Sequence, residues 1–467
     1  MTSDAEPRRL HRAAILVEAL ASALQLLGTV IVVAVVKGGG GLITFVVASA
    51  VGGIGVGALI GYRRWKATTY WIDDVALHHR SGVFTPDTKL VPRSRVQSVD
   101  TSTGVLQRLF GVVELRVQVA GASDEDEIVL PAVTYEEAAR LRRALGQPEP
   151  AAPDERVRLG IGGLLLAALT GPQIGAAASA VGGVYALVNN AVNVQDGEGL
   201  LQRLNTTGEI AVAVAVVLGG AYVLSFLAGI VVFAGFEAER DGRVLRIRRG
   251  LLARRGLSIP LERVDGVVII EGVLRGPLGL ASLQIESASY GGEKTAARTL
   301  LPLVRRSRAE EVIARLLPAL TVAPGPLERP PRRALRRFAL RPALAGAVIG
   351  GAPALAVGGP AWAAVPALAS VGALVGARAY RAAGVRLDGG VVVVREARLA
   401  RRTLLVRSHR LQAHALERTP LQARAQLADL RVTVGSGGHG RARHLDRATA
   451  QAAFGALRRG AAVGSER

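Results

Sequence analysis

The chain has 467 residues, of which 50% are hydrophobic, and it carries a formal net charge of +21 with no cysteine. Disulfides and thiolate chemistry are therefore excluded. A basic chain of this kind is a candidate nucleic-acid binder. However, only 4% of its residues are aromatic, which leaves few side chains to stack on bases, so we expect no nucleic-acid partner.

The hydrophobic residues are concentrated in long runs, which indicates a membrane protein. The runs in chain order are 13–36, 42–62, 159–188, 210–233 and 343–377. Each of the first four meets the requirement of about 20 apolar residues for a membrane-spanning helix. The last run is interrupted by Pro353, Pro360 and Pro366, and we interpret it as two short helices, 343–357 and 361–377. A single bent or re-entrant element is the alternative.

Basic residues flank these runs on one side, and the loops on the opposite side carry almost none. Lys37 is the only basic residue in 36–41, and Arg203 the only one in 189–208. The positive-inside rule therefore predicts that the N-terminus, the C-terminus and all soluble segments are cytoplasmic. The flanking residues are Arg8, Arg9, Arg12, Arg63, Arg64, Lys66, Arg156, Arg158, Arg332, Arg333, Arg336, Arg337, Arg378 and Arg381.

Each pair of apolar runs is followed by a soluble segment with several short alternating strands and then one helix. In the first segment Thr134 and Glu137 have the spacing of a capping box, which predicts a helix from Thr134 to about residue 145. Ser307 and Glu310 repeat this spacing in the second segment, and Asp446 is the expected cap of a helix at 447–458. The pattern predicts a small β-barrel or sandwich closed by a C-terminal helix.

The three soluble segments are copies of one another. Pro92, Arg95 and Gly111 fall on Pro260, Arg263 and Gly279 at a constant offset without a gap. The third copy is weaker: Arg410 stands at the Arg95 position, but Arg407 replaces the proline and Gln426 replaces the turn glycine. A function assigned to one copy must therefore be considered for all three.

The motifs of the first copy are Gly-Val-Phe at 82–84, Val-Pro at 91–92 with Arg-Val-Gln at 95–97, and Val-Leu-Gln-Arg-Leu-Phe-Gly at 105–111. With them the chain resembles the bacterial pleckstrin-homology (PH) domain family of YdbT- and YdbS-like membrane proteins. The resemblance implies PH-like barrels tethered to the membrane and no enzymatic activity. The first copy keeps the full motif, so we expect it to be the copy that recognises a ligand.

The predicted fold is an α+β membrane protein with three transmembrane helical hairpins, each followed by a PH-like β-barrel or sandwich with a C-terminal helix. The predicted boundaries are a cytoplasmic N-terminus at 1–12, hairpin 1 at 13–62, PH-like domain 1 at 63–146, a linker at 147–158, hairpin 2 at 159–233, PH-like domain 2 at 234–320, a Pro/Arg-rich linker at 321–342, hairpin 3 at 343–377 and the divergent PH-like domain 3 at 378–460.

No pattern indicates a catalytic, cofactor-binding or metal site. Residues 435–440 spell G-x-G-x-x-G, but the residues that follow are typical of a strand and not of a helix, so we interpret them as a hairpin loop. His78 and His79 are neighbours on a predicted strand, where they point to opposite faces and are poorly placed to share a metal ion.

Arg95, Arg263 and Arg410 recur at one position in the three copies. In one interpretation each fixes a nearby carboxylate, such as Glu114 or Asp265. In the other they bind a lipid headgroup or a partner, because guanidinium binds phosphate in a bidentate manner. Arg93, Arg108 and Arg275 would extend that surface.

Two features within the apolar runs concern helix packing and charge. Gly53, Gly57 and Gly61 form overlapping G-x-x-x-G units, which predict close packing against another helix. Glu18 is an ionisable group inside the first run. It is either paired with Arg9 or Arg12 at the membrane surface or part of an ion relay.

We therefore expect a non-enzymatic scaffold or adaptor in the cell membrane, whose three cytoplasmic PH-like domains bind protein partners or anionic lipid. The expected partners are membrane lipids and either a second PH-like membrane protein or another copy of the chain. The alternative is a transporter or a subunit of a transport complex, although the apolar runs hold few of the polar residues that transport requires.

Overall fold

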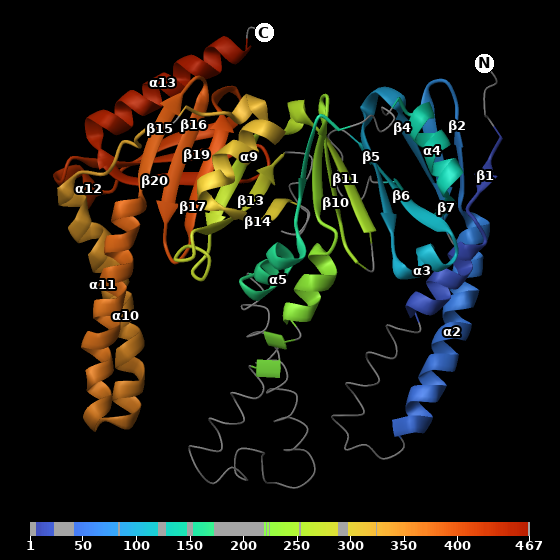
Figure 1. Cartoon of the computed structure of the whole chain (residues 1–467), viewed down its shortest axis with the longest axis horizontal. Helices are drawn as coiled ribbons and strands as arrows, with labels where there is room; N and C mark the ends of the chain where they lie inside the picture. Colours follow the sequence, from blue (N-terminus) through green and yellow to red (C-terminus); the bar gives the residue numbers. More distant parts are fainter. Residues whose placement is uncertain are drawn as a thin grey trace. The chain divides into compact units, whose positions relative to one another are not determined.

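The computed structural model describes residues 6–22, 42–82, 85–119, 128–146, 153–171, 219–220, 222–223, 225–251, 254–287, 298–323 and 325–465 (Figure 1). Large parts of the predicted spans 13–36, 159–188 and 210–233 lie outside these residues. Within the described part, the segment Gly359–Ala382 is long and apolar enough to cross a membrane, and Ala13–Ser22 is a shorter apolar helix. The structure therefore does not show the three predicted transmembrane hairpins.

The chain forms two units, residues 1–237 with 246–258 and residues 238–245 with 259–467, each of which is described by itself. The helices and strands of the first unit are β1 (Arg8–Arg9), the helix Ala13–Ser22, α2 (Leu42–Ala67), β2 (Thr69–Ile72), β3 (Ala76–Ser81), β4 (Asp87–Pro92), β5 (Val96–Thr103), α3 (Val105–Leu109), β6 (Val112–Val119), β7 (Ile128–Thr134), α4 (Tyr135–Ala144), β8 (Glu155–Arg158) and α5 (Ile161–Leu169). Strands β9 (Glu237–Asp241), β10 (Val244–Arg249) and β11 (Arg254–Pro260) belong to the second repeat.

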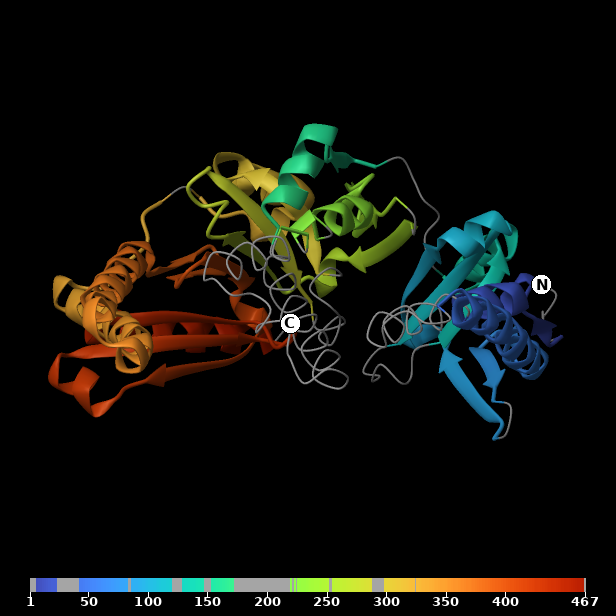
Figure 2. The same ribbon diagram turned by 90° about the horizontal axis from the view of Figure 1, so that it is seen from below.

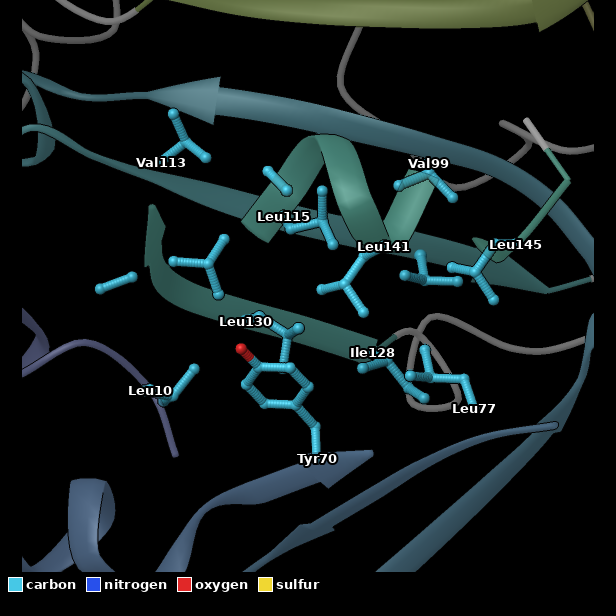
Figure 3. Close-up of a cluster of buried hydrophobic side chains, with 14 of the residues drawn as sticks. Leu10, Tyr70, Leu77, Val99, Val113, Leu115, Ile128, Leu130, Leu141 and Leu145 are labelled. Atoms are coloured by element: carbon cyan, nitrogen blue, oxygen red, sulfur yellow. The ribbon is translucent and has the colours of Figure 1, made fainter. Parts of the chain in front are cut away.

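The first repeat has two sheets with α4 packed against the second. One sheet has the order β1-β2-β3-β4, and in the other β7, β6, β5 and β11 are neighbours. Leucines and isoleucines from both sheets and from α4 fill the space between them, with Leu77, Leu115, Ile128, Leu130 and Leu141 almost fully buried (Figure 3). The alternation of apolar and polar residues along these strands places the apolar set on the inner face.

Of the three predicted helix caps, the structure confirms two and contradicts one. Thr134 accepts a hydrogen bond from the Glu137 amide at 3.2 Å and begins α4 as expected. Asp446 likewise accepts from the Ala448 amide at the start of the last helix. The capping box expected at Ser307 is wrong, because Ser307 lies in a 3₁₀ turn and the following helix has no side-chain cap.

The second unit contains the rest of the second repeat and the whole third repeat. Its elements are β12 (Gly266–Glu271), β13 (Leu280–Glu286), β14 (Thr299–Arg305), α9 (Ala309–Leu316), α10 (Leu335–Val357), α11 (Ala364–Ala382), β15 (Gly384–Asp388), β16 (Val391–Ala397), β17 (Arg401–Arg407), β18 (Leu411–Glu417), α12 (Pro420–Arg424), β19 (Leu427–Val434), β20 (His439–Asp446) and α13 (Arg447–Ser465). A six-stranded sheet has the order β14-β13-β12-β17-β16-β15, and a three-stranded sheet has the order β18-β19-β20. The second and third repeats therefore share one sheet through β12 and β17.

The divergent third copy retains the repeat fold. Gly111 and Gly279 both adopt a φ of 65°, a left-handed conformation that favours glycine. Gln426 stands at the same position in the third copy and adopts a φ of 51°. The replacement of the glycine thus leaves the turn in place, at the cost of backbone strain.

The apolar block at 343–377 forms two antiparallel helices, α10 and α11, which lie side by side (Figure 2). Helix α10 begins at Leu335, well before the predicted start at 343. Glycines let the two backbones approach: a Cβ on Gly350 would lie 2.6 Å from the Ala364 carbonyl oxygen, and Gly346, Gly372 and Gly376 are more crowded still. Small residues thus allow the close approach of these two helix backbones.

The predicted glycine face of α2 packs against the helix Ala13–Ser22. A Cβ on Gly57 would lie 2.8 Å from the Ala19 Cα, and one on Gly61 would lie 3.0 Å from the Glu18 Cβ. Gly53 is also buried. Glu18 pairs with Arg64 at 2.6 Å and not with Arg9 or Arg12, because the C-terminal end of α2 brings Arg64 beside it.

Candidate functional site

The recurrent arginines have different surroundings in the three repeats. Arg410 donates a hydrogen bond at 2.7 Å to the Glu262 carbonyl oxygen in the turn between β11 and β12. Arg263 is half-buried in that turn. Arg95 is exposed and has no hydrogen-bond or ion-pair partner within the described part of the chain. Its predicted partner Glu114 instead pairs with Arg116 at 2.6 Å.

The other predicted arginines do not form one surface. Arg93 is half-buried and faces the Asp74 carbonyl oxygen at 3.4 Å, whereas Arg108 is exposed. Arg275 is buried and donates to the Pro302 carbonyl oxygen at 2.9 Å, and burial lowers its pKa to about 10. Arg275 therefore supports the fold of the second repeat and is not available to a ligand.

A more concentrated basic site lies in the third repeat. A cavity of about 320 Å³ is bounded by the N-terminal part of α10, the C-terminal part of α11, the β16–β17 turn and strands β19 and β20. Five of its lining residues are arginines. They are Arg337, Arg341, Arg398, Arg441 and Arg443.

Asp429 is the carboxylate that lines the cavity, and its charge is already compensated. It accepts hydrogen bonds from Gln422 Nε2 at 2.6 Å, from the His444 amide at 2.7 Å and from Arg441 Nε at 3.0 Å. Arg441 also pairs with Glu417 at 2.7 Å. Asp429 and Arg441 are therefore fixed to each other and leave the remaining arginines to determine the charge of the cavity.

Among the described residues, no carboxylate lies within ion-pair distance of Arg341, Arg398 or Arg443. Burial lowers the pKa of Arg443, the charge of Arg398 lowers it further, and the charges of Glu396 and Asp429 oppose the shift. The cavity thus gathers five arginines against the one carboxylate that lines it.

His444 shares this environment. Burial lowers its pKa; Asp429 opposes the shift, and Arg341 and Arg337 add to it. Its Nδ1 atom lies 2.9 Å from Gln422 Nε2, which is a donor, so Nδ1 accepts and the ring is neutral at pH 7.

The cavity can hold a small anion with an apolar tail. Guanidinium groups bind phosphate in a bidentate manner, and they do so more strongly where water is partly excluded. Phe338 and Leu399 supply apolar walls beside the arginines. Val375, Gly376 and Ala379 line the cavity from within the segment that is long enough to cross a membrane, which places it at the end of that segment.

The sequence contains a signal for this site that the motif comparison did not reveal. Arg337 and Arg341 are four residues apart on a helix, and Arg441 and Arg443 are two apart on a strand, so each pair lies on one face. Arg337 was interpreted as part of the basic flank of a span, and the second pair belongs to the copy with the weakest motif.

The other singled-out motifs are structural. In the G-x-G-x-x-G loop between β19 and β20, Ser436 Oγ donates to Glu286 Oε2 at 2.6 Å and joins the third repeat to the second. His78 bonds to Asp73 at 2.7 Å and stacks on Trp71, whereas His79 is buried. The described residues contain no group of three His, Asp or Glu side chains placed to hold a metal ion.

The fold and its repetition define a chain of PH domains, and comparison with known proteins confirms this. The family model described as "Bacterial PH domain" matches residues 19–149, 159–320 and 340–461, so the chain belongs to the bacterial PH domain family and carries three copies. It is 25% identical over 468 residues to the UPF0699 transmembrane protein YdbT of Bacillus subtilis (strain 168), covering 93% of this chain and 94% of that protein. No solved structure matches the chain.

Proposed function

We propose that the chain is a non-enzymatic membrane scaffold whose three cytoplasmic PH domains lie at the inner membrane surface, and that the arginine-lined cavity of the third repeat binds the phosphate of an anionic lipid. The observation that carries the proposal is the cluster of five arginines at the end of Gly359–Ala382, of which Arg341, Arg398 and Arg443 have no carboxylate within ion-pair distance among the described residues. Arginines at this depth meet lipid phosphates, because helix ends lie in the headgroup layer.

The proposed topology has three transmembrane hairpins, at 13–62, 159–233 and 343–377, with both termini in the cytoplasm. The relative that is named a transmembrane protein matches 93% of this chain, and this supports the insertion of the chain in a membrane. The apolar runs and their one-sided basic flanks support the number of spans and their orientation.

The binding site is tested on the full chain in neutral detergent by native mass spectrometry, with phosphatidylglycerol and phosphatidylcholine as lipids. Charged hydrogen bonds contribute about 1.5–3 kcal/mol each. Removing one arginine should therefore weaken phosphatidylglycerol binding by about tenfold to a hundredfold. We expect this for Arg341→Gln and for Arg443→Gln, with little change for phosphatidylcholine.

Arg424→Gln is the matched control, because Arg424 is an exposed arginine of the same repeat that does not line the cavity. A competition with inorganic phosphate separates lipid from a free anion as the ligand. Equal loss of phosphatidylglycerol in the control and the cavity variants, or no loss in either, would contradict the proposal.

A further inference from the structure

The repeats of this chain are joined by strand pairing in a repeated register. In the first unit β5 pairs antiparallel with β11, with Ser102 opposite Arg255 and Thr103 opposite Arg254. In the second unit β12 pairs with β17 from Gly266 opposite Val406 to Glu271 opposite Arg401. At the constant offset between copies, Thr103 corresponds to Glu271 and Arg254 corresponds to Arg401. The two strand pairings that join repeats, called joints below, therefore have the same register.

Each repeat has a 3₁₀ turn with one strand before it and one strand after it. Each joint pairs the strand after this turn in one repeat (β5 or β12) with the strand before the same turn in the next repeat (β11 or β17). By this rule β4 of the first repeat and β18 of the third repeat are the two strands left over. Both are terminal strands of their sheets among the described residues. The described part of the chain therefore has one unpaired edge strand of the kind that precedes the turn, β4, and one of the kind that follows it, β18.

The side chains on these edges are exposed where their counterparts in the joints are buried. Leu90 on β4 is 56% exposed, whereas Leu405 at the same position of β17 is 4% exposed. Ala413 and Ala415 on β18 are exposed, whereas Gly266 and Val268 at the same positions of β12 are buried.

Arg95 gives independent evidence that a neighbour is missing from the first repeat. In the third repeat, Arg410 donates to the Glu262 carbonyl oxygen of the preceding repeat. Arg95 stands at the same position in the first repeat and has no such partner within the described residues. A second copy of the chain would supply this acceptor if it paired at that edge as the repeats of one chain pair with each other.

We propose that β18 of one chain pairs antiparallel with β4 of a second copy of this chain, in the register of the internal joints. That register places Ala413 opposite Val91, His414 opposite Leu90 and Ala415 opposite Lys89. Arg95 of the second copy then donates to the His409 carbonyl oxygen, as Arg410 does to that of Glu262.

A second copy fits better than an unrelated partner because this chain carries both edges and already pairs such edges twice. In this register one pair of opposed residues has like charges, and their repulsion is compensated. Asp87 is opposite Glu417, but Glu417 is already paired with Arg431 at 3.0 Å and Arg441 at 2.7 Å. Since the two edges differ, the contact is head-to-tail, and such contacts form a ring if the rotation closes and an open chain if it does not.

The test uses single-cysteine variants of the full chain, which has no cysteine of its own. Leu90→Cys and His414→Cys, co-expressed as two separately tagged chains, are oxidised in isolated membranes. Directly opposed residues have Cα atoms about 4.5–5.5 Å apart, within disulfide reach. We expect a disulfide-linked dimer that contains one chain of each kind.

The register control pairs Leu90→Cys with Leu416→Cys, which lies two residues from the opposed position, at about 7–8 Å, beyond disulfide reach. A charge test at the exposed Ala415 uses matched variants: Ala415→Lys places like charges opposite each other and Ala415→Glu opposite charges. We expect the yield of cross-linked dimer to be about two- to fivefold lower with lysine than with glutamate. Equal yields in the matched and offset pairs, equal yields for the two charge variants, or cross-linking to a different protein would overturn the proposal.

Discussion

The joint between the second and third repeats has a buried ion pair whose removal should open the shared sheet. Glu271 ends β12 and is only 5% exposed. Its carboxylate lies 3.0 Å from Arg401 Nη1 on β17 and 3.3 Å from Arg306 Nε. Glu271→Ala leaves both guanidinium groups beside a desolvated site without a counter-charge.

The expected cost follows from the burial of the three groups. Breaking a fully buried ion pair costs about 3–5 kcal/mol. The side chains of Arg401 and Arg306 are 34% and 22% exposed, so water compensates part of the loss. We expect about 2–3 kcal/mol, which corresponds to a loss of hydrogen-exchange protection of about 30- to 150-fold in β12 and β17.

Hydrogen exchange followed by mass spectrometry measures this protection in the full chain, peptide by peptide. Glu310→Ala is the matched control, because Glu310 pairs with the same Arg306 at 3.0 Å but its side chain is 55% exposed. That pair should contribute less than about 1 kcal/mol. Loss of protection in β12 and β17 that is no greater for Glu271→Ala than for Glu310→Ala would refute the reasoning.

Three further predictions concern the cap, the hairpin and pH. Thr134→Ala should lower the free energy of unfolding of the first repeat by about 1 kcal/mol, measured by denaturant titration. Gly350→Val should lower the Tm, because its Cβ would meet the Ala364 carbonyl oxygen, whereas Gly351→Ala, with open space around it, should not. The pKa of His444 is lowered by burial, so stability should fall as pH drops below about 6.5, where the unfolded chain binds the proton. His444→Asn should reduce that loss in a Tm series from pH 8 to 5.

The order of elements within each repeat could be predicted because it depends on local patterns. Alternating strands, the Thr134 cap and the positive-φ turn at Gly111 all act over a few residues. The joints could not be predicted, because pairing of β12 with β17 joins residues far apart in the chain and leaves no local signature. The same limit applies to Arg275, whose burial depends on strands that the motif itself does not contain.

The arginine-lined cavity was not predicted for a related reason. Retention of the family motif favoured the first copy as the one that recognises a ligand, and loss of the proline counted against the third. In the structure the residue that replaces this proline, Arg407, donates at 2.6 Å to the Val264 carbonyl oxygen and at 3.2 Å to that of Glu262. The departure from the motif is therefore a contact between repeats, which attaches the third copy to the second.

This attachment connects the two proposals for the third repeat. One side of the repeat is fixed to the second repeat through β17, Arg407 and Arg410, and another side packs on α10 and α11 around the arginine-lined cavity. Strand β18 is the part that neither contact uses. A lipid in the cavity would neutralise arginines on β20, which shares its sheet with β18 through β19.

If both proposals hold, Arg443→Gln should weaken phosphatidylglycerol binding while leaving the cross-link between Leu90→Cys and His414→Cys intact, because Arg443 does not lie on the pairing edge. Loss of both in this variant would show that the cavity shapes the third repeat as a whole instead of binding lipid as a separate site.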